Sequence, residues 1–216
     1  MSAIKISTKS TADNAYRMWK DNPTYVRRCQ ILSLPEIHSA VPQFVIDELI
    51  MSNGGSKASI IVTQPRRLSA IGVAARVAAE RLEDGSVGYA IRGESKQSPQ
   101  TKILFCTTGV ILRRLGSGDK LDNVTHIIVD EVLVLLLSTV ATRLTTLLQV
   151  HERSVDGDIL LLELRELLKV HSKLKVILMS ATINHEVFIK YFDNAPLLTI
   201  PGFTHPVEDL WVSDMP

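Results

Sequence analysis

The sequence is poor in cysteine, in aromatic residues and in net charge, and these shortages restrict the classes of function that it can have. Cys29 and Cys106 are its two cysteines, and neither lies in a CxxC pair or near a His/Cys cluster. A zinc site of that type and a disulfide framework are therefore not indicated. A formal charge of +1 gives no global field that attracts nucleic acid, so any such contact must come from locally clustered arginines.

The N-terminus also lacks a long apolar run. Residues Met1 to Lys20 are polar and have no hydrophobic core of a secretory signal, so we expect a cytoplasmic or nuclear protein. The 216 residues, of which 45% are hydrophobic, suffice for one domain with a buried core.

The order of apolar segments predicts an α/β fold. Short β-branched runs alternate with helical periodicity from Ser59 onward, a pattern typical of βαβ units in a mostly parallel sheet with helices on both faces. The predicted strands are Ile60 to Thr63, Val87 to Ile91, Ile103 to Cys106, His126 to Asp130, Val176 to Met179 and Leu197 to Ile200. The predicted crossover helices are Leu68 to Leu82, Val110 to Leu115 and Ile159 to Val170.

An acidic pair follows one of these strands, where the ligands of open α/β sheets bind. Asp130 and Glu131 emerge directly after the apolar run Ile127 to Val129. In phosphoryl-transfer sites one such carboxylate holds a nucleotide-bound Mg²⁺ and its neighbour positions the attacking water. By themselves, two acidic residues after a strand are equally typical of a turn or a helix N-cap.

Two further segments connect this pair to a known family. His151-Glu152-Arg153-Ser154 precedes an acidic helix start, and Met179-Ser180-Ala181-Thr182 ends a later strand. Together with Asp130-Glu131 they resemble the DEAH/DExH-box RNA helicases, in which an Asp-Glu-x-His motif runs into Glu-Arg-Ser and is followed by Ser-Ala-Thr. The resemblance implies a RecA-like P-loop NTPase domain, the first of two, that uses ATP and Mg²⁺.

The resemblance also implies roles for individual residues. Asp130 would bind Mg²⁺ through the nucleotide, Glu131 would position the hydrolytic water, and His151 would link the nucleotide to coupling. Ser180 and Thr182 would connect hydrolysis to strand separation, although a Ser-Ala-Thr run after a strand is otherwise an ordinary helix-initiating sequence.

Two other segments after strands resemble RNA-contacting motifs of the family. Both would meet the phosphate backbone of a single strand, through hydroxyl and guanidinium groups and backbone N–H groups, and would not read bases. Without the surrounding motifs, these arginines would be read as a solvated helix face. The residues are Thr63, Gln64, Pro65, Arg66 and Arg67 in the first segment, and Thr107, Thr108, Gly109, Arg113 and Arg114 in the second.

The phosphate-binding loop of the family is missing. No G-x-x-x-x-G-K-[ST] run occurs, although backbone N–H groups and a lysine are needed there to neutralise the phosphates. Leu34-Pro35, which resembles the segment before that loop, is followed almost at once by Val41 to Phe44, which resembles the segment after it. We therefore expect that a core strand and the loop are deleted from the sequence. The glycine-lysine runs Gly54 to Lys57 and Gly116 to Lys120 have the wrong spacing and are predicted turns.

An insert splits the Asp-Glu-x-His motif. Leu133 to Val150 separate Val132 from His151, which would displace His151 from the magnesium site even though a long loop costs little closure entropy. The insert is too polar for a membrane span. The sharp edges of deletion and insert suggest wrongly assigned exon boundaries as one explanation.

We therefore predict an N-terminal, partly helical arm (1–40), a truncated and incomplete RecA-like domain (41–207) and the start of a linker (208–216) to a second RecA-like domain that this chain lacks. The chain is expected to be a fragment of an ATP-dependent RNA helicase, inactive by itself, with RNA as its partner and no membrane contact. The alternatives are a nonenzymatic RNA-binding or interaction module and a mispredicted gene fragment.

Overall fold

The polar connections of the sequence separate strands and helices that assemble into a layered α/β domain. The computed structural model describes residues 29–33, 38–131, 155–180 and 185–199. Its sheet has eight strands in the order β4-β3-β5-β2-β6-β7-β1-β8. All neighbouring strands are parallel except β3 and β4, which form an antiparallel hairpin.

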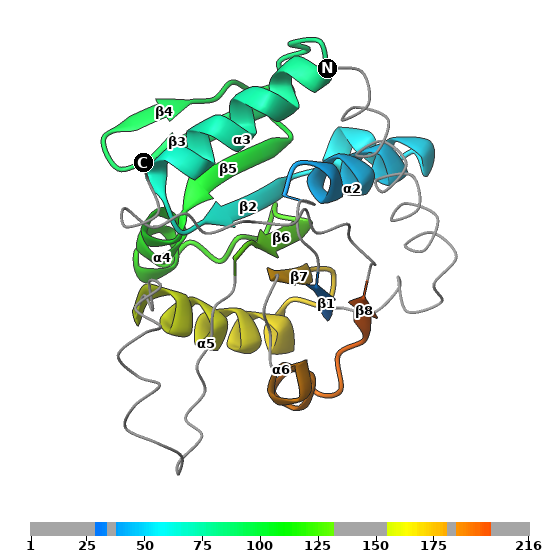
Figure 1. The fold of residues 1–216 in the computed structure, drawn as a ribbon, viewed down its shortest axis with the longest axis vertical. Helices are drawn as coiled ribbons and strands as arrows, with labels where there is room; N and C mark the ends of the chain where they lie inside the picture. Colours follow the sequence, from blue (N-terminus) through cyan, green and yellow to red (C-terminus); the bar gives the residue numbers. More distant parts are fainter. Residues whose placement is uncertain (1–28, 34–37, 132–154, 181–184, 200–216) are drawn as a thin grey trace, which may run out of the picture.

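The strands are short, and the side chains of β2, β5, β6 and β7 are mostly buried. Their bounds are β1 (Cys29–Ser33), β2 (Ile60–Gln64), β3 (Val87–Ile91), β4 (Glu94–Lys96), β5 (Ile103–Thr107), β6 (His126–Val129), β7 (Lys175–Ser180) and β8 (Leu197–Thr199). The helices are α2 (Ala40–Met51), α3 (Arg67–Glu80), α4 (Thr108–Gly116), α5 (Val155–Val170) and α6 (His185–Tyr191), and a 3₁₀ turn, η2, spans Gly55–Lys57. Figure 1 shows their arrangement.

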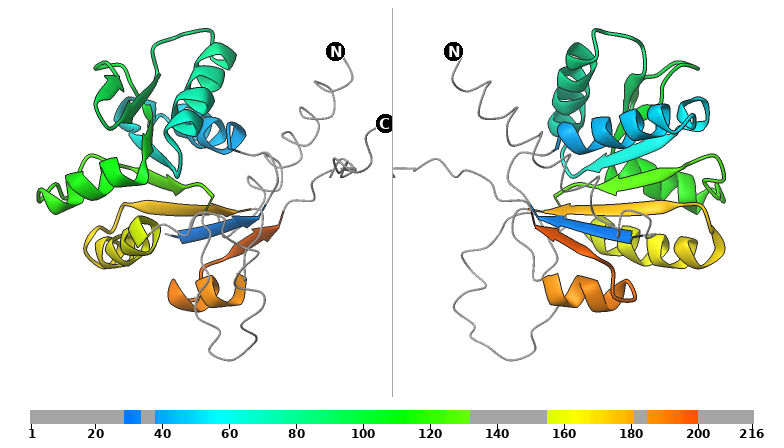
Figure 2. Two further views of the ribbon diagram at one scale, coloured as in Figure 1. Left: turned by 60° about the vertical axis from the view of Figure 1, so that its left-hand side comes forward. Right: turned by 90° about the vertical axis from the view of Figure 1, so that its right-hand side faces the viewer.

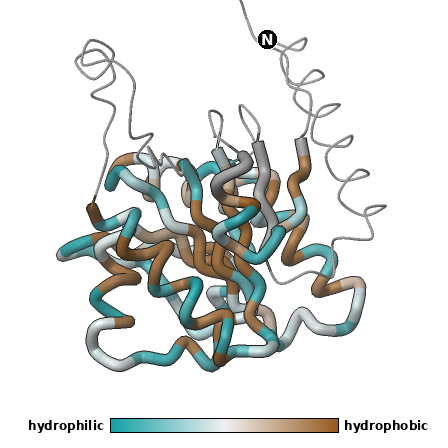
Figure 3. The backbone as a smooth tube through the Cα atoms, turned by 90° about the horizontal axis from the view of Figure 1, so that it is seen from below, coloured by the Kyte–Doolittle hydropathy of each residue, from teal (hydrophilic) through white to brown (hydrophobic). Residues whose placement is uncertain are grey.

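Helices cover both faces of the sheet, so the domain has three layers (Figure 2). On one face, α2 and α3 pack on the strands through residues such as Val45 and Val77, together with Ile60 and Val62. On the other face, the apolar sides of α4, α5 and α6 meet residues that include Ile61 of β2. Successive β2 side chains thus enter opposite cores, as the period of two in a strand requires. Figure 3 shows the hydrophobic segments gathered between the layers.

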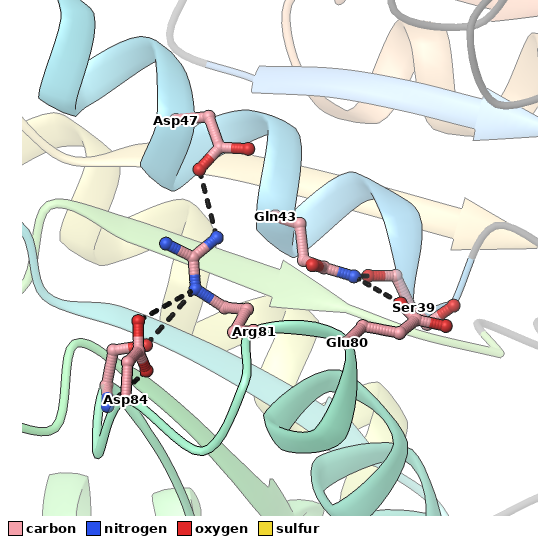
Figure 4. A network of polar contacts seen from close by, with 7 residues as sticks. Ser39, Gln43, Asp47, Glu80, Arg81 and Asp84 are labelled. Atoms are coloured by element: carbon pink, nitrogen blue, oxygen red, sulfur yellow. Dashed lines mark hydrogen bonds and ion pairs between the residues drawn. The ribbon is translucent and has the colours of Figure 1, made fainter.

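A polar network fixes α2 against α3 (Figure 4). Gln43 Nε2 donates to the Ser39 carbonyl oxygen at 3.1 Å and to Glu80 Oε2 at 2.7 Å. Arg81, just after α3, donates from an NH to Asp47 Oδ1 at 2.9 Å. Because these bonds tie two successive turns of α2 to the C-terminal end of α3, the start of α2 has a defined position at the sheet.

The fold class is confirmed, and so are the six predicted strands and three predicted crossover helices, with end shifts of a few residues at most. The two glycine-lysine runs also form turns, with η2 in the first and a positive φ of 85° at Gly118 in the second. The prediction missed α2, α6, the edge strand β4 and β1.

The sheet contains a strand within the segment predicted to be an arm. Residues Cys29–Ser33, which lie in the segment predicted to be an arm, form β1 between β7 and β8 and precede α2. This five-residue segment lies near two prolines, and its pattern is too short to distinguish a strand from a loop. Among the described helices, none is long and apolar enough to cross a bilayer.

Candidate functional site

The C-terminal end of β6 carries the acidic residue that the sequence placed at the centre of the site. Asp130 follows β6 directly, and its N–H donates to the Thr63 carbonyl oxygen of β2 at 3.1 Å. This bond extends the parallel ladder of β2 and β6 by one step beyond the pair Thr63 and Val129. Asp130 is 3% exposed, so its carboxylate lies inside the sheet edge and must be satisfied by protein groups.

Three donors surround that carboxylate. His38 Nδ1 lies 2.7 Å from both Oδ1 and Oδ2. Gln64 Nε2 donates to Oδ2 at 2.5 Å, and the Glu131 backbone N–H donates to Oδ1 at 2.9 Å. An ionised carboxylate accepts about four hydrogen bonds. The contacts with His38, Gln64 and Glu131 therefore satisfy Asp130 within the protein.

His38 reaches Asp130 because α2 starts beside it. The ring lies two residues before α2, whose inner face is anchored by Val41 and Val45, at 2% and 0% exposure. Sequence reasoning missed this residue: 92 positions separate it from Asp130, and a single histidine before a helix has no metal or carboxylate spacing. Only the missed strand β1 and helix α2 together would have placed it at the sheet edge.

The implied magnesium does not fit this arrangement. Mg²⁺ needs carboxylate oxygens with an open coordination position, and both Asp130 oxygens accept hydrogen bonds at 2.5 to 2.9 Å. Within the described ranges, no group of three or more His, Cys, Asp or Glu side chains could hold a metal ion.

The other predicted catalytic residues are only partly described. Glu131 is exposed and has a positive φ of 53°, so its backbone lies in the left-handed region directly after Asp130. Ser180 ends β7, is buried at 5% exposure, and is the register partner of Ser33 in β1. His151 and Thr182 lie outside the described residues, as does the insert 133–150. Their predicted roles stay predictions.

The first predicted RNA segment divides into a buried half and an exposed half. Thr63 and Gln64 are each 1% exposed, so they line the interior of the sheet edge. Arg66 and Arg67 are exposed at the start of α3, and an NH of Arg67 lies 3.4 Å from the Arg92 carbonyl oxygen after β3. The helix has no acidic residue in its first turn and no side-chain cap, which leaves its positive end uncompensated by its own sequence.

The second predicted RNA segment places its two arginines in different surroundings. Arg113 is exposed on α4, and its Nε donates to the Gly109 carbonyl oxygen of the same helix at 3.1 Å. Arg114 instead forms an ion pair with Asp119, with Nε and a terminal nitrogen at 2.9 and 2.8 Å from Oδ2. The Leu121 N–H and Arg114 together lower the pKa of the Asp119 carboxyl, so the carboxylate stays charged at neutral pH.

The remaining residues of these segments are half-buried at the sheet edge: Pro65, Thr107, Thr108 and Gly109. A shallow groove between α4 and α5 is lined by Gly109, Arg113 and Asp156, among others. Asp156 lies against the first turn of α4, 3.7 Å from where a side chain on Gly109 would start. This carboxylate partly offsets the positive end of α4, so the groove has charges of both signs.

Two buried titratable groups belong to the core. Burial raises the pKa of the Cys106 thiol to about 12, so this cysteine is inert at neutral pH. Burial, followed by the charge of Lys175, lowers the pKa of His126 to about 3. Both side chains lie on central strands, where they serve packing.

Comparison with known proteins gives the chain a family. A protein of Mycosarcoma maydis assigned to the DEAH-box ATP-dependent helicases is 51% identical over 188 residues. A DExH-box ATP-dependent RNA helicase of Arabidopsis thaliana is 49% identical over 177 residues, and an ATP-dependent DNA/RNA helicase of Homo sapiens is 44% identical over 180 residues. No family model matches the chain. Each similarity covers 81% of this chain but only 11 to 16% of the relative. Over most of its length, the chain is thus similar to one segment of the DEAH/DExH-box helicases.

Proposed function

We propose that the chain is the first RecA-like domain of an RNA helicase of this family and that, alone, it binds the phosphate backbone of single-stranded RNA without hydrolysing ATP. The observation that carries the RNA contact is the position of the arginines. The neighbouring strands β3, β5 and β2 are each followed by an arginine: Arg92, Arg113 on α4, and Arg66 with Arg67.

The physical reason is the common direction of these strands. Parallel strands end at one edge of a sheet, so these guanidinium groups come to the same side of the domain. Arginine forms forked hydrogen bonds with phosphate and remains charged at all physiological pH values. A net charge of +1 rules out a strong overall field, so the contact is local and sensitive to salt.

The lack of hydrolysis follows from the phosphate and metal positions. The sequence has no G-x-x-x-x-G-K-[ST] loop, so the lysine and glycine-rich backbone that would hold a triphosphate are missing. Asp130 is also satisfied by His38 and Gln64. The relatives are named as ATP-dependent helicases, and we propose that this chain retains their RNA-facing part.

The test is fluorescence anisotropy with labelled oligouridine over a series of KCl concentrations. A chain that contacts phosphates loses affinity as salt rises, with a slope of about 0.7 per phosphate on logarithmic axes. The triple variant Arg66→Ala/Arg67→Ala/Arg113→Ala should lower that slope by roughly 2. Absence of binding by the wild-type chain near 50 mM KCl would refute the RNA proposal, and release of phosphate from ATP would refute the inactivity.

The split motif needs its own experiment, because a native protein without the insert could be a working motor. Tryptic peptides of the protein from its own cells decide this. A peptide covering Leu144 to Arg153 shows that the insert is translated and favours the nonenzymatic alternative. A peptide that joins Val132 directly to His151 shows a gene-model error and favours an active helicase.

A further inference from the structure

The outer side of α5 carries a row of apolar residues that the RNA proposal does not use. On the inner side of the helix, Leu160 and Leu164 are fully buried in the core. On the outer side, Val155, Ile159 and Leu162 are 70%, 43% and 53% exposed. Residues spaced by four and then three positions lie on one face of a helix. These three residues therefore form a continuous apolar strip, termed here the α5 stripe.

The α5 stripe covers only the first half of the helix. The next positions at the same spacing are Glu166 and Lys169, which form an ion pair with Oε1 and Nζ 2.6 Å apart. Charged residues of this kind are typical of a helix face that meets water. Adjacent exposed apolar residues instead mark a contact site. The part of α5 that requires a partner is thus the part nearest its start at Val155.

The segment that precedes α5 in the chain has a matching pattern. The insert 133–150 contains eleven apolar residues among its eighteen. Its leucines and one valine repeat at alternating spacings of four and three: Leu133, Leu137, Val140, Leu144 and Leu147. Polar residues repeat with the same spacing on the opposite side: Ser138, Thr142, Thr145 and Gln149. This pattern predicts an amphipathic helix with one apolar side.

The length of the connection favours α5 as the surface that this side meets. Four residues, His151 to Ser154, separate the insert from α5. Connections of about 2 to 8 residues join antiparallel neighbouring helices. Such a pairing places Leu147 opposite Ile159 and Leu144 opposite Leu162, because the members of each pair are nearly equally far from the connection. A helix of eighteen residues is about 27 Å long and one of sixteen about 24 Å, so the two lengths also match.

We propose that the insert 133–150 docks as an antiparallel helix on the α5 stripe of the same chain. The apolar side of the insert then covers Val155, Ile159 and Leu162, and its threonines face water. The inference stands apart from the proposed RNA contact, which depends on arginines outside α5. It concerns the chain as its sequence stands, with the insert translated.

Limited digestion with trypsin tests the docking, because Arg143 is the only lysine or arginine of the insert. The variant Ile159→Gln/Leu162→Gln removes the apolar surface and keeps charge and helix propensity nearly unchanged. Trypsin cleaves a segment only when it is open. We expect cleavage after Arg143 to be about 10-fold faster in this variant than in the wild-type chain. Equal rates would overturn the proposal.

A matched control uses two exposed apolar residues away from the stripe. Leu82 and Val170 are 90% and 79% exposed, and Leu82→Gln/Val170→Gln should leave cleavage after Arg143 at the wild-type rate. Sedimentation velocity of the same proteins tests a second copy as the partner. A wild-type dimer that dissociates in Ile159→Gln/Leu162→Gln, with unchanged cleavage after Arg143, assigns the stripe to that copy and overturns the proposal.

A disulfide experiment decides the question even if Ile159→Gln/Leu162→Gln does not fold. Under mild oxidation, Leu147→Cys/Ile159→Cys should form an intramolecular disulfide, which peptide mapping identifies. Thr145→Cys/Ile159→Cys, which starts from the polar side of the insert, should form it about 10-fold more slowly, since a disulfide needs its Cα atoms within about 7 Å. Equal rates for the two pairs contradict a docked helix. Oligouridine binding, measured separately on the wild-type chain, shows whether the RNA proposal stands or fails.

Discussion

Arg113 and Arg114 offer a sharp test of the RNA-binding edge, because adjacent arginines of one helix differ in their partners. Arg114 is bound to Asp119 through two nitrogens at 2.9 and 2.8 Å. Arg113 is exposed and bonds the Gly109 carbonyl of its own helix through Nε. We expect Arg113→Ala to weaken RNA binding and Arg114→Ala to leave it nearly unchanged.

The expected size follows from counterion release. Loss of one phosphate contact lowers the salt slope by about 0.7, which at about 0.1 M salt corresponds to roughly 5-fold in affinity, or about 1 kcal/mol. Arg114 and Asp119 are each 38% exposed, so their ion pair contributes only about 0.2 to 1 kcal/mol to stability. Arg114→Ala should therefore lower the free energy of unfolding slightly and change RNA affinity by less than about 2-fold.

The assay is oligouridine anisotropy over a salt series, with urea unfolding of both variants to confirm that each is folded. Equal losses of affinity in Arg113→Ala and Arg114→Ala would show that the Asp119 ion pair opens for RNA. A loss of RNA affinity in Arg114→Ala alone would place the RNA on the other side of α4. Either result would refute the assignment of the contact to Arg113.

Four further predictions concern stability and reactivity. Gly88→Ala should lower the free energy of unfolding by about 1 to 3 kcal/mol, because the new Cβ would lie 2.5 Å from the Lys96 carbonyl oxygen. Gly72→Ala, in α3 with nothing within 4 Å, should instead stabilise by about 0.5 to 1 kcal/mol in the same urea titration. Burial lowers the pKa of His126 to about 3, so on acidification the unfolded chain binds a proton at this histidine before the folded chain does. The free energy of unfolding should therefore fall by roughly 1.4 kcal/mol per pH unit below about pH 6. The His126→Asn variant should lack this pH dependence. Burial raises the pKa of Cys106 to about 12, so this thiol should resist iodoacetamide in the native protein at pH 8 and react in urea. Rapid labelling of the native protein would contradict its burial.

The strands and helices that could be predicted are those whose periodicity is long enough to read. β2, β5 and β6 are continuous apolar runs, as expected for strands covered on both faces, and α5 repeats its leucines at helical spacing. β1 and α2 were missed for different reasons. Cys29–Ser33 is five residues between charged and proline-containing segments, and α2 carries Pro42 in its first turn, where proline is compatible with a helix but reads as a breaker.

The candidate site shows a similar division. Residues after strands could be predicted, because parallel topology brings strand ends together whatever the side chains are. The hydrogen-bond partners of those residues could not be predicted. Nothing local in the sequence indicates that Gln64 points at Asp130 or that His38 covers it, since both contacts depend on the register of β2 with β6 and on the position of α2.

The order of the strands places the arginines of the proposed RNA contact beside the strand that leads to Asp130. β2 lies between β5 and β6, so the backbones of β2 and β6 are one strand spacing apart, roughly 4.8 Å. The Asp130 carboxylate that follows β6 is buried and accepts hydrogen bonds from Gln64 and the Glu131 N–H, with His38 in hydrogen-bond contact. The edge therefore carries exposed arginines along β3, β5 and β2, while the carboxylate on β6 already accepts hydrogen bonds from protein groups, which is the arrangement on which the proposed function rests.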